Sequence, residues 1–228
     1  MEVELTQAEV SEILASRAAA YSFLSRAYRQ EASAAFLQGL VEELANTTDE
    51  DAESEGHRLL RHYVRGIAQA DLDNVETELG AEYAALFLNA SPKPVHPFES
   101  VYTSSDRLLM QQARDEVLAE YRQEGLARIG DFKEPEDHIA IELEFMAHLC
   151  QKTAEALGAG DTGAAAGYLQ KQQRFLEKHL LVWVPAFCRD LAARATSDFY
   201  RGIGRLTEDH LALEGETIAE LLEAVKEL

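Results

Sequence analysis

The stretch Glu134-Pro-Glu-Asp-His-Ile-Ala-Ile-Glu-Leu-Glu-Phe-Met146 decides the fold class, because it fits two different periodicities. Apolar residues at 139, 141, 143 and 145 alternate with small or charged ones, which is typical of a half-buried strand. Apolar residues at 139, 143, 146 and 150 also follow helical spacing, and Pro135 suits the first position of a helix because its missing N–H is not needed there. Since no partner strand is predicted elsewhere, we interpret the stretch as a helix that begins at Pro135.

The rest of the chain has the composition and spacing of a helical protein. Glycine and proline are scarce, with 13 and 5 residues, and apolar residues recur mainly every three or four positions. The sequence therefore predicts an all-α fold, a single domain over residues 1–228 formed by one helical bundle of about ten helices. The expected helices cover residues 6–31, 34–45, a segment from the acidic run 49–55 to 70, 73–89, 105–124, 135–158, 161–179, a segment that begins at Pro185, 196–209 and 214–227.

Capping residues, prolines and glycines predict where these helices end. Thr6 and Glu9 match the Ser/Thr-x-x-Glu capping box, and Asp73 and Asp161 are the expected caps of two later helices. Residues 90–100 contain three of the five prolines and are expected to form a stiff, extended loop. Residues 125–134 form a second break, which we interpret as a hinge that can join two lobes of the bundle.

The chain is strongly acidic, with 41 Asp and Glu residues against 21 Lys and Arg residues and a formal net charge of −20. This charge disfavours nucleic acids and anionic membranes and favours a cationic partner such as a basic peptide. No apolar run approaches the roughly 18 residues that span a bilayer, and residues 1–6 are acidic where a signal peptide would be basic. We therefore expect a soluble cytoplasmic protein in which Cys150 and Cys188 are ordinary buried thiols.

The sequence gives little support for catalysis or for a bound metal. Di-iron helical proteins use Glu-x-x-His motifs, and none occurs here. The nearest arrangements, His138 with Glu142 and Glu144 with His148, are pairs four residues apart that we interpret as solvent-facing charge pairs. Phosphate-binding glycine motifs are also missing from the sequence. We predict a protein without catalytic residues, metal or cofactor; a metal-binding helical-bundle enzyme is the alternative class.

Physical chemistry alone favours a structural interpretation of several notable residues. Asp137 would lie in the first turn of its helix, where the helix dipole stabilises a carboxylate by roughly 0.3–1 kcal/mol, and His138 would pack or face solvent. Tyr83, Leu86 and Phe87 follow spacings of three and four, which is typical of a buried helix face. These patterns taken singly indicate stability and not binding.

Several segments together change that interpretation. They are Tyr83-Ala-Ala-Leu-Phe87, Pro97-Phe-Glu-Ser-Val-Tyr102, Glu134-Pro-Glu-Asp-His-Ile139, Phe175-Leu-Glu-Lys-His-Leu180, Trp183-Val-Pro-Ala-Phe187 and Phe199-Tyr-Arg201. In order and spacing the first three, the three motifs, resemble the signature of the TorD/DmsD family of cytoplasmic redox-enzyme maturation chaperones, and the last three look like the closing helices of that family. The resemblance covers nearly the whole chain. Tyr83 stands where other members often have tryptophan, and Phe98-Glu99 departs from the Trp-Gly of some members.

The resemblance implies an all-helical chaperone that binds the twin-arginine signal peptide of a molybdopterin oxidoreductase of the dimethyl sulfoxide or trimethylamine N-oxide reductase type. Such a chaperone holds the apoenzyme until its cofactor is inserted and so prevents premature export by the Tat translocase. The resemblance implies no catalytic turnover. It also implies that the protein is either a monomer or a homodimer whose two chains exchange lobes through the hinge. A nitrate-reductase-type assembly chaperone is the nearby alternative, and a scaffold for folded partners is a further one.

The resemblance also implies which residues bind the peptide. A twin-arginine peptide presents two guanidinium groups and then an apolar stretch, so its receptor needs carboxylates beside apolar side chains. The acid and histidine of the third motif would supply the polar contacts, and the two earlier motifs would supply apolar and amphipathic ones. The expected signal-peptide-binding residues are Asp137, His138, Tyr83, Leu86, Phe87, Pro97, Phe98, Ser100 and Tyr102.

Overall fold

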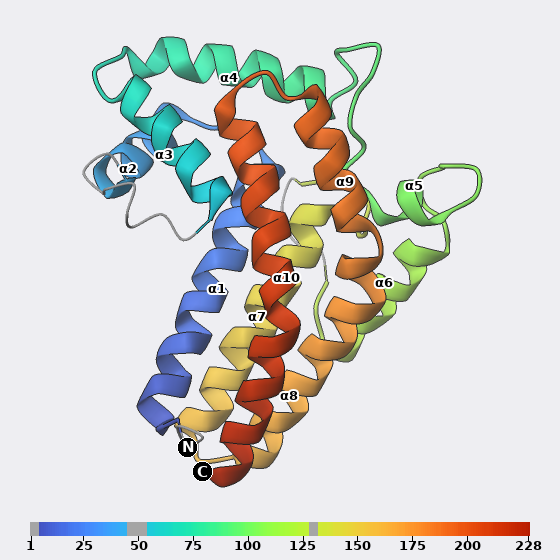
Figure 1. Ribbon diagram of the computed structural model, residues 1–228. Coiled ribbons are helices and arrows are strands. Elements are labelled where there is room, and N and C mark those ends of the chain that lie inside the picture. Colours follow the sequence, from blue (N-terminus) through green and yellow to red (C-terminus); the bar gives the residue numbers. More distant parts are fainter. Residues whose placement is uncertain (1–4, 45–53, 128–131) are drawn as a thin grey trace. The chain divides into compact units, whose positions relative to one another are not determined.

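The computed structural model describes residues 5–44, 54–127 and 132–228, and over these ranges the protein is all-α, as predicted (Figure 1). The elements are α1 (Gln7–Arg29), α2 (Ala34–Leu44), α3 (Glu55–Ile67), α4 (Leu72–Phe87), α5 (Glu99–Thr103), α6 (Gln112–Gln123), α7 (Ile139–Gly158), α8 (Thr162–Phe175), the π-helical turn η2 (Leu176–Leu180), α9 (Leu181–Arg194) and α10 (Asp198–Glu227). No helix among the described residues is long and apolar enough to cross a membrane. Residues 49–53 of the predicted acidic run lie outside the described ranges.

The chain divides into two compact units. Unit 1 comprises residues 1–26, 98–183 and 211–228, and unit 2 comprises residues 27–97 and 184–210. Helices α1, α9 and α10 each supply residues to both units. The units do not divide at the predicted hinge 125–134, because its described residues 125–127 and 132–134 all belong to unit 1. Residues 128–131 of the predicted hinge lie outside the described part of the chain.

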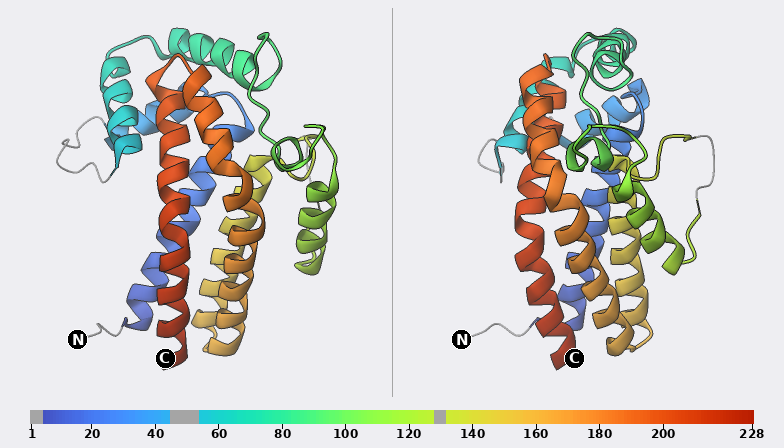
Figure 2. Two further views of the ribbon diagram at one scale, coloured as in Figure 1. Left: turned by 45° about the vertical axis from the view of Figure 1, so that its right-hand side comes forward. Right: turned by 90° about the vertical axis from the view of Figure 1, so that its right-hand side faces the viewer.

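Unit 1 is organised around α7, whose residues 139–150 are buried on almost every side. The ribbons of α7, α8 and the unit 1 parts of α1 and α10 run side by side (Figures 1 and 2). Ser25 Oγ donates a hydrogen bond of 2.7 Å to the carbonyl of Ala140, and Arg17 pairs with both carboxylate oxygens of Glu214 at 2.9 and 2.6 Å. Because this first part of α7 is buried nearly all round, its sequence satisfies strand-like and helical spacing at once.

Unit 2 brings α3 and α4 against the unit 2 parts of α9 and α10. A Cβ on Gly202 would lie 2.9 Å from Leu60 Cγ, and a Cβ on Gly56 would lie 2.5 Å from the backbone nitrogen of Leu206. Glycine is therefore required at both positions for α3 and α10 to approach this closely.

Side-chain caps fix several helix starts. The capping box is confirmed, since Glu9 Oε2 accepts a 2.8 Å hydrogen bond from the Thr6 N–H. Asp161 caps α8 as predicted by accepting a 2.8 Å bond from the Ala164 N–H. The prediction for α4 is wrong by two residues: Asp71 is the N-cap and accepts from the N–H of Asp73, which lies inside the first turn.

Two other predicted starts are wrong for identifiable reasons. Helix α6 begins at Gln112 and not near 105, because Arg107 and Met110 have φ angles of 52° and 58°, which lie outside the right-handed helical region. Helix α7 begins at Ile139 and not at Pro135, because the His138 backbone is extended and its ring caps the helix. Asp137 therefore precedes the cap instead of lying in the first turn.

The C-terminal elements are longer than predicted. Helical structure runs from α8 through the π turn η2 into α9, so Pro185 lies inside α9 and does not begin it. A π turn lies where the interruption near this proline was predicted, and it alters the helical hydrogen-bond ladder without ending the helix. The two predicted helices 196–209 and 214–227 are one helix of 30 residues, α10.

Candidate functional site

Asp137 holds the start of the short helix α5. It is completely buried, its carbonyl accepts a 3.0 Å hydrogen bond from the Glu99 N–H, and its Oδ2 accepts a 2.9 Å bond from the Ser100 N–H. The first N–H groups of a helix have no partner within it, so Asp137 satisfies two such donors of α5. Among the described residues its second oxygen, Oδ1, is buried and has no hydrogen-bond partner.

His138 caps α7 and is packed between aromatic rings. Its Nδ1 accepts a 3.1 Å hydrogen bond from the Ala140 N–H, so in this arrangement Nδ1 carries no proton. The rings of Phe98 and Phe132 each lie edge-on at 5.1 Å between centroids. The acid and histidine of the motif are thus both buried, and they act on two different helices, α5 and α7.

Ser100 connects Asp137 to an exposed apolar loop. Its N–H donates to Asp137 Oδ2, and its Oγ accepts a 3.1 Å hydrogen bond from the Gln111 N–H. The loop 104–111 lies between Ser100 and the end of this hydrogen bond at Gln111. In it, the side chains of Leu108, Leu109 and Met110 are 54%, 45% and 60% exposed. Arg107 and Met110 in this loop have positive φ angles of 52° and 58°, and a strained backbone beside exposed apolar side chains is of the kind found at binding sites.

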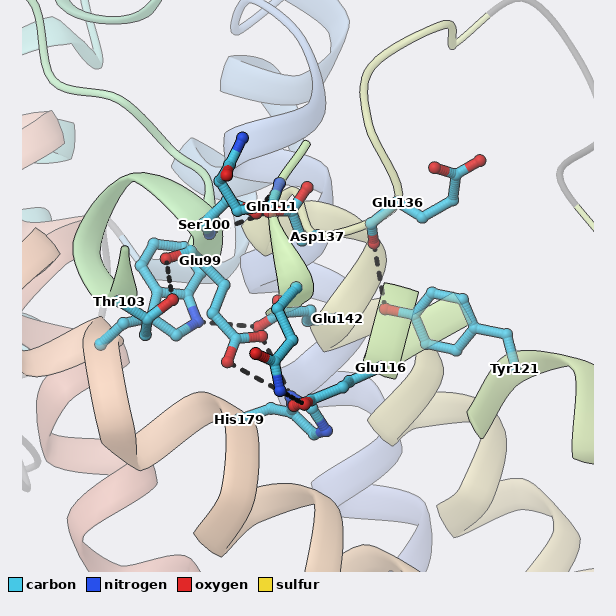
Figure 3. A network of polar contacts seen from close by, with 12 residues as sticks. Glu99, Ser100, Thr103, Gln111, Glu116, Tyr121, Glu136, Asp137, Glu142 and His179 are labelled. Carbon is cyan, nitrogen blue, oxygen red and sulfur yellow. Dashed lines mark hydrogen bonds and ion pairs between the residues drawn. The ribbon is translucent and has the colours of Figure 1, made fainter. Parts of the chain in front are cut away.

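A cluster of buried carboxyl groups extends from Asp137 into unit 1 (Figure 3). His179 Nδ1 lies 3.0 Å from Glu99 Oε2, and Trp183 Nε1 donates a 3.0 Å hydrogen bond to Glu142 Oε2. The side chains of Glu99 and Glu142 point toward one another (Figure 3), and both are almost fully buried. We call Glu99, Asp137, Glu142 and His179 the buried acid cluster.

The buried acid cluster favours proton uptake by Glu142. Burial raises its pKa well above the usual value of 4.5, and the neighbouring charge of Glu99 raises it further. The hydrogen bond from Trp183 acts in the opposite direction, while the charge of Asp137 and a hydrogen bond with Glu99 add to the increase. Glu142 therefore holds a proton at pH values where an exposed glutamate is ionised.

The other predicted site residues divide between the two units. Phe98 and Ser100 are buried in unit 1, where the half-buried Tyr102 ring lies 5.5 Å from that of Trp183. The remaining four, Tyr83, Leu86, Phe87 and Pro97, are buried in unit 2.

Within unit 2, Tyr83 and Phe87 belong to an aromatic core. Tyr83 OH donates a 3.0 Å hydrogen bond to the carbonyl of Tyr28, and its ring lies 5.1 Å from that of Phe87. The Phe87 ring in turn lies 5.9 Å from Tyr200 and 6.4 Å from Phe187. In this structure these side chains stabilise unit 2, and their contact with a peptide stays a prediction.

Sequence reasoning missed Glu99, Glu142, His179 and Trp183. The interpretation of Glu142 as part of a solvent-facing pair with His138 is wrong, because Glu142 is 0% exposed. A signal was present: His179 and Trp183 are four residues apart and share a helix face. Among the described residues, no group of three or more His, Cys, Asp or Glu side chains is arranged to hold a metal ion.

Comparison with known proteins agrees with the motifs. The pattern of the family described as "Nitrate reductase delta subunit" matches residues 26–189. A protein named "Chaperone protein TorD" from Vibrio cholerae is 28% identical over 82% of this chain and 80% of its own length, and one from Shewanella pealeana is 25% identical over 91% and 92%. A third, from Photobacterium profundum, is 31% identical over 56% of this chain and 58% of its own length.

The family match covers well over half of the chain, and the named relatives are chaperones. The all-α fold and the positions of the three motifs fit this assignment. The chain therefore belongs to the nitrate reductase delta subunit family and, within it, to the TorD/DmsD-type chaperones of redox-enzyme maturation.

Proposed function

We propose that this protein is a cytoplasmic chaperone that binds the twin-arginine signal peptide of a molybdopterin oxidoreductase of the dimethyl sulfoxide or trimethylamine N-oxide reductase type. It holds the apoenzyme until the cofactor is inserted, acts as one chaperone domain over residues 1–228, and catalyses no reaction. The observation that carries the proposal is the exposed apolar loop 104–111, which Ser100 connects to the carboxylate of Asp137.

The loop suits the apolar part of a signal peptide. Leu108, Leu109 and Met110 form a continuous exposed run, and methionine adapts to ligands of differing shape because its side chain is unbranched and polarisable. Burying one such side chain against a ligand contributes about 1.5–3 kcal/mol at most. Three of them are sufficient for a substantial part of a micromolar affinity, which corresponds to about 8 kcal/mol.

Asp137 and the chain's negative charge suit the two arginines. Asp137 Oδ2 positions α5, and Oδ1 is left for a donor from the peptide, for which α5 has to move aside. The net charge of −20 speeds the encounter with a cationic peptide and makes the association rate fall as salt is added.

Titration calorimetry of the full chain with a synthetic twin-arginine leader tests the proposal. Leu108→Ser and Met110→Ser are each expected to weaken binding about tenfold or more, the loss that corresponds to 1.4 kcal/mol. Leu213→Ser is the matched control, because Leu213 is 65% exposed on α10 and lies far along the chain from the loop. Equal affinity in all three variants and the parent protein contradicts the role of the loop.

The name of the matching family favours a second client. Its description refers to a nitrate reductase, whereas the named relatives are TorD chaperones. Leaders of the two reductase classes, offered to the parent protein in separate titrations, distinguish these clients by affinity.

A further inference from the structure

Helix α3 is a basic element in an acidic chain. After Glu55 it contains His57, Arg58, Arg61, His62 and Arg65 and no further acid. The three arginines are three and four residues apart, so they share one face of the helix. Arg58 and Arg65 are exposed, whereas Arg61 between them is only 3% exposed.

Within the described ranges, Arg61 lacks partners for two of its three side-chain nitrogens. Among the described residues, its Nε and Nη1 atoms are buried without any hydrogen-bond partner. Guanidinium stays protonated at all physiological pH values, so burial cannot be relieved by loss of the proton. Burying a charge without a counter-charge is strongly unfavourable.

Arg17 shows how this protein stabilises a buried arginine with its own residues. Arg17 is 5% exposed, and its Nε and Nη2 atoms pair with the two carboxylate oxygens of Glu214. No corresponding ion pair of Arg61 occurs in the described part of the chain. Arg61 is buried as Arg17 is, but no carboxylate of the described residues pairs with it, and this difference points to a ligand as the source of the counter-charge.

We propose that Arg61, flanked by Arg58 and Arg65, is the centre of an anion-binding site in unit 2 that takes the phosphate groups of a small molecule. Residues 58 and 65 are about 10 Å apart along the helix axis, at 1.5 Å per residue, so their long side chains can converge on a group bound over Arg61. Several guanidinium groups match a diphosphate better than a single carboxylate, because a diphosphate carries more negative charge and more acceptor oxygens for their paired N–H donors. The net charge of −20 opposes a nucleic acid or a membrane as the source of the phosphate.

Titration of the full chain with pyrophosphate, in buffer free of phosphate and sulfate, tests this site. The expected result is one bound pyrophosphate per chain, with affinity at least tenfold weaker in Arg61→Gln and several-fold weaker in Arg58→Gln. Arg189→Gln removes the same charge from an exposed position on α9 and is expected to bind like the parent protein. Absence of binding to the parent protein, equal affinity in all variants, or equally tight binding of citrate overturns the proposal.

The melting midpoint without ligand distinguishes a ligand site from a partner within the chain. Arg61→Gln removes an unpaired buried charge, so its midpoint is expected to equal or exceed that of the parent protein. A clearly lower midpoint overturns the proposal, because it shows that the folded chain itself pairs with Arg61. The Arg58→Gln variant retains Arg61, so its binding result is independent of this outcome.

Discussion

Replacement of Glu142 by glutamine is expected to change how the stability of the protein depends on pH. Glutamine keeps the shape of the side chain, and its Oε1 can still accept the hydrogen bond from Trp183. Its amide group can donate to Glu99, which the protonated carboxyl of Glu142 does in the parent protein. The variant therefore imitates the protonated state and removes the titration.

The sign of the effect follows from the raised pKa of Glu142. The folded protein binds a proton that the unfolded chain releases above its pKa of about 4.5, so the parent protein loses stability as pH rises from there to the folded-state pKa. One proton corresponds to about 1.4 kcal/mol per pH unit over that window. The groups that face Glu142 are Glu99, Asp137 and Tyr121, with His179 beside Glu99.

Urea unfolding at a series of pH values between 4.5 and 8 measures the effect. The stability of the Glu142→Gln variant relative to the parent protein is expected to increase with pH by about 1.4 kcal/mol per unit and then to level off. Glu144→Gln, an exposed position on the same helix, is the matched control and is expected to run parallel to the parent protein. Trp183 is the single tryptophan, so its fluorescence reports the same titration locally. A Glu142→Gln profile parallel to that of the parent protein refutes the assignment of the raised pKa.

Three further predictions concern stability and binding. Asp137→Ala is expected to lower the free energy of unfolding by about 1–3 kcal/mol in urea, because α5 loses its buried acceptor. Asp137→Asn is expected to keep most of that stability but to weaken peptide binding in calorimetry. An Asp137→Asn variant that is unstable but binds the peptide normally contradicts the assigned roles. His138→Ala is expected to cost about 1 kcal/mol as the loss of an N-cap, and an unchanged unfolding midpoint argues against that cap. Glu214→Gln is expected to lower the free energy of unfolding by about 3–5 kcal/mol, because it leaves Arg17 buried without its counter-charge. The double variant Arg17→Met with Glu214→Leu removes both charges and is expected to lose less stability; an equal loss shows that the unpaired charge is not the cause.

Local patterns were sufficient to predict the fold class and many helix positions. Spacings of three and four identify nearly every helix, and Asp161 identifies the start of α8, because both signals come from neighbours within one turn. The start of α6 was not predictable in this way, since the loop before it is held by the hydroxyl groups of Ser100 and Ser104. Such bonds depend on the folded path of the chain.

The candidate site was predicted only in part for the same reason. The motif indicated Asp137 and His138, but the assumption that Pro135 begins the helix placed Asp137 in the wrong position relative to the cap. The burial of Glu142 depends on Glu99 and Trp183, which lie on other elements and about 40 residues away in sequence. A periodicity that covers one helix contains no information about such partners.

The division of the chain into interleaved segments has a consequence for biosynthesis. Unit 2 is complete at residue 210, whereas unit 1 still needs residues 211–228. As the ribosome makes the chain, Arg17 and Tyr21 are synthesised long before their partner Glu214, which follows Arg17 by 197 residues and Tyr21 by 193 residues. Closing so long a loop is entropically costly and slows folding, so unit 1 can complete its fold only after translation has passed unit 2. The chaperone thus spends part of its own synthesis as an incomplete nascent chain.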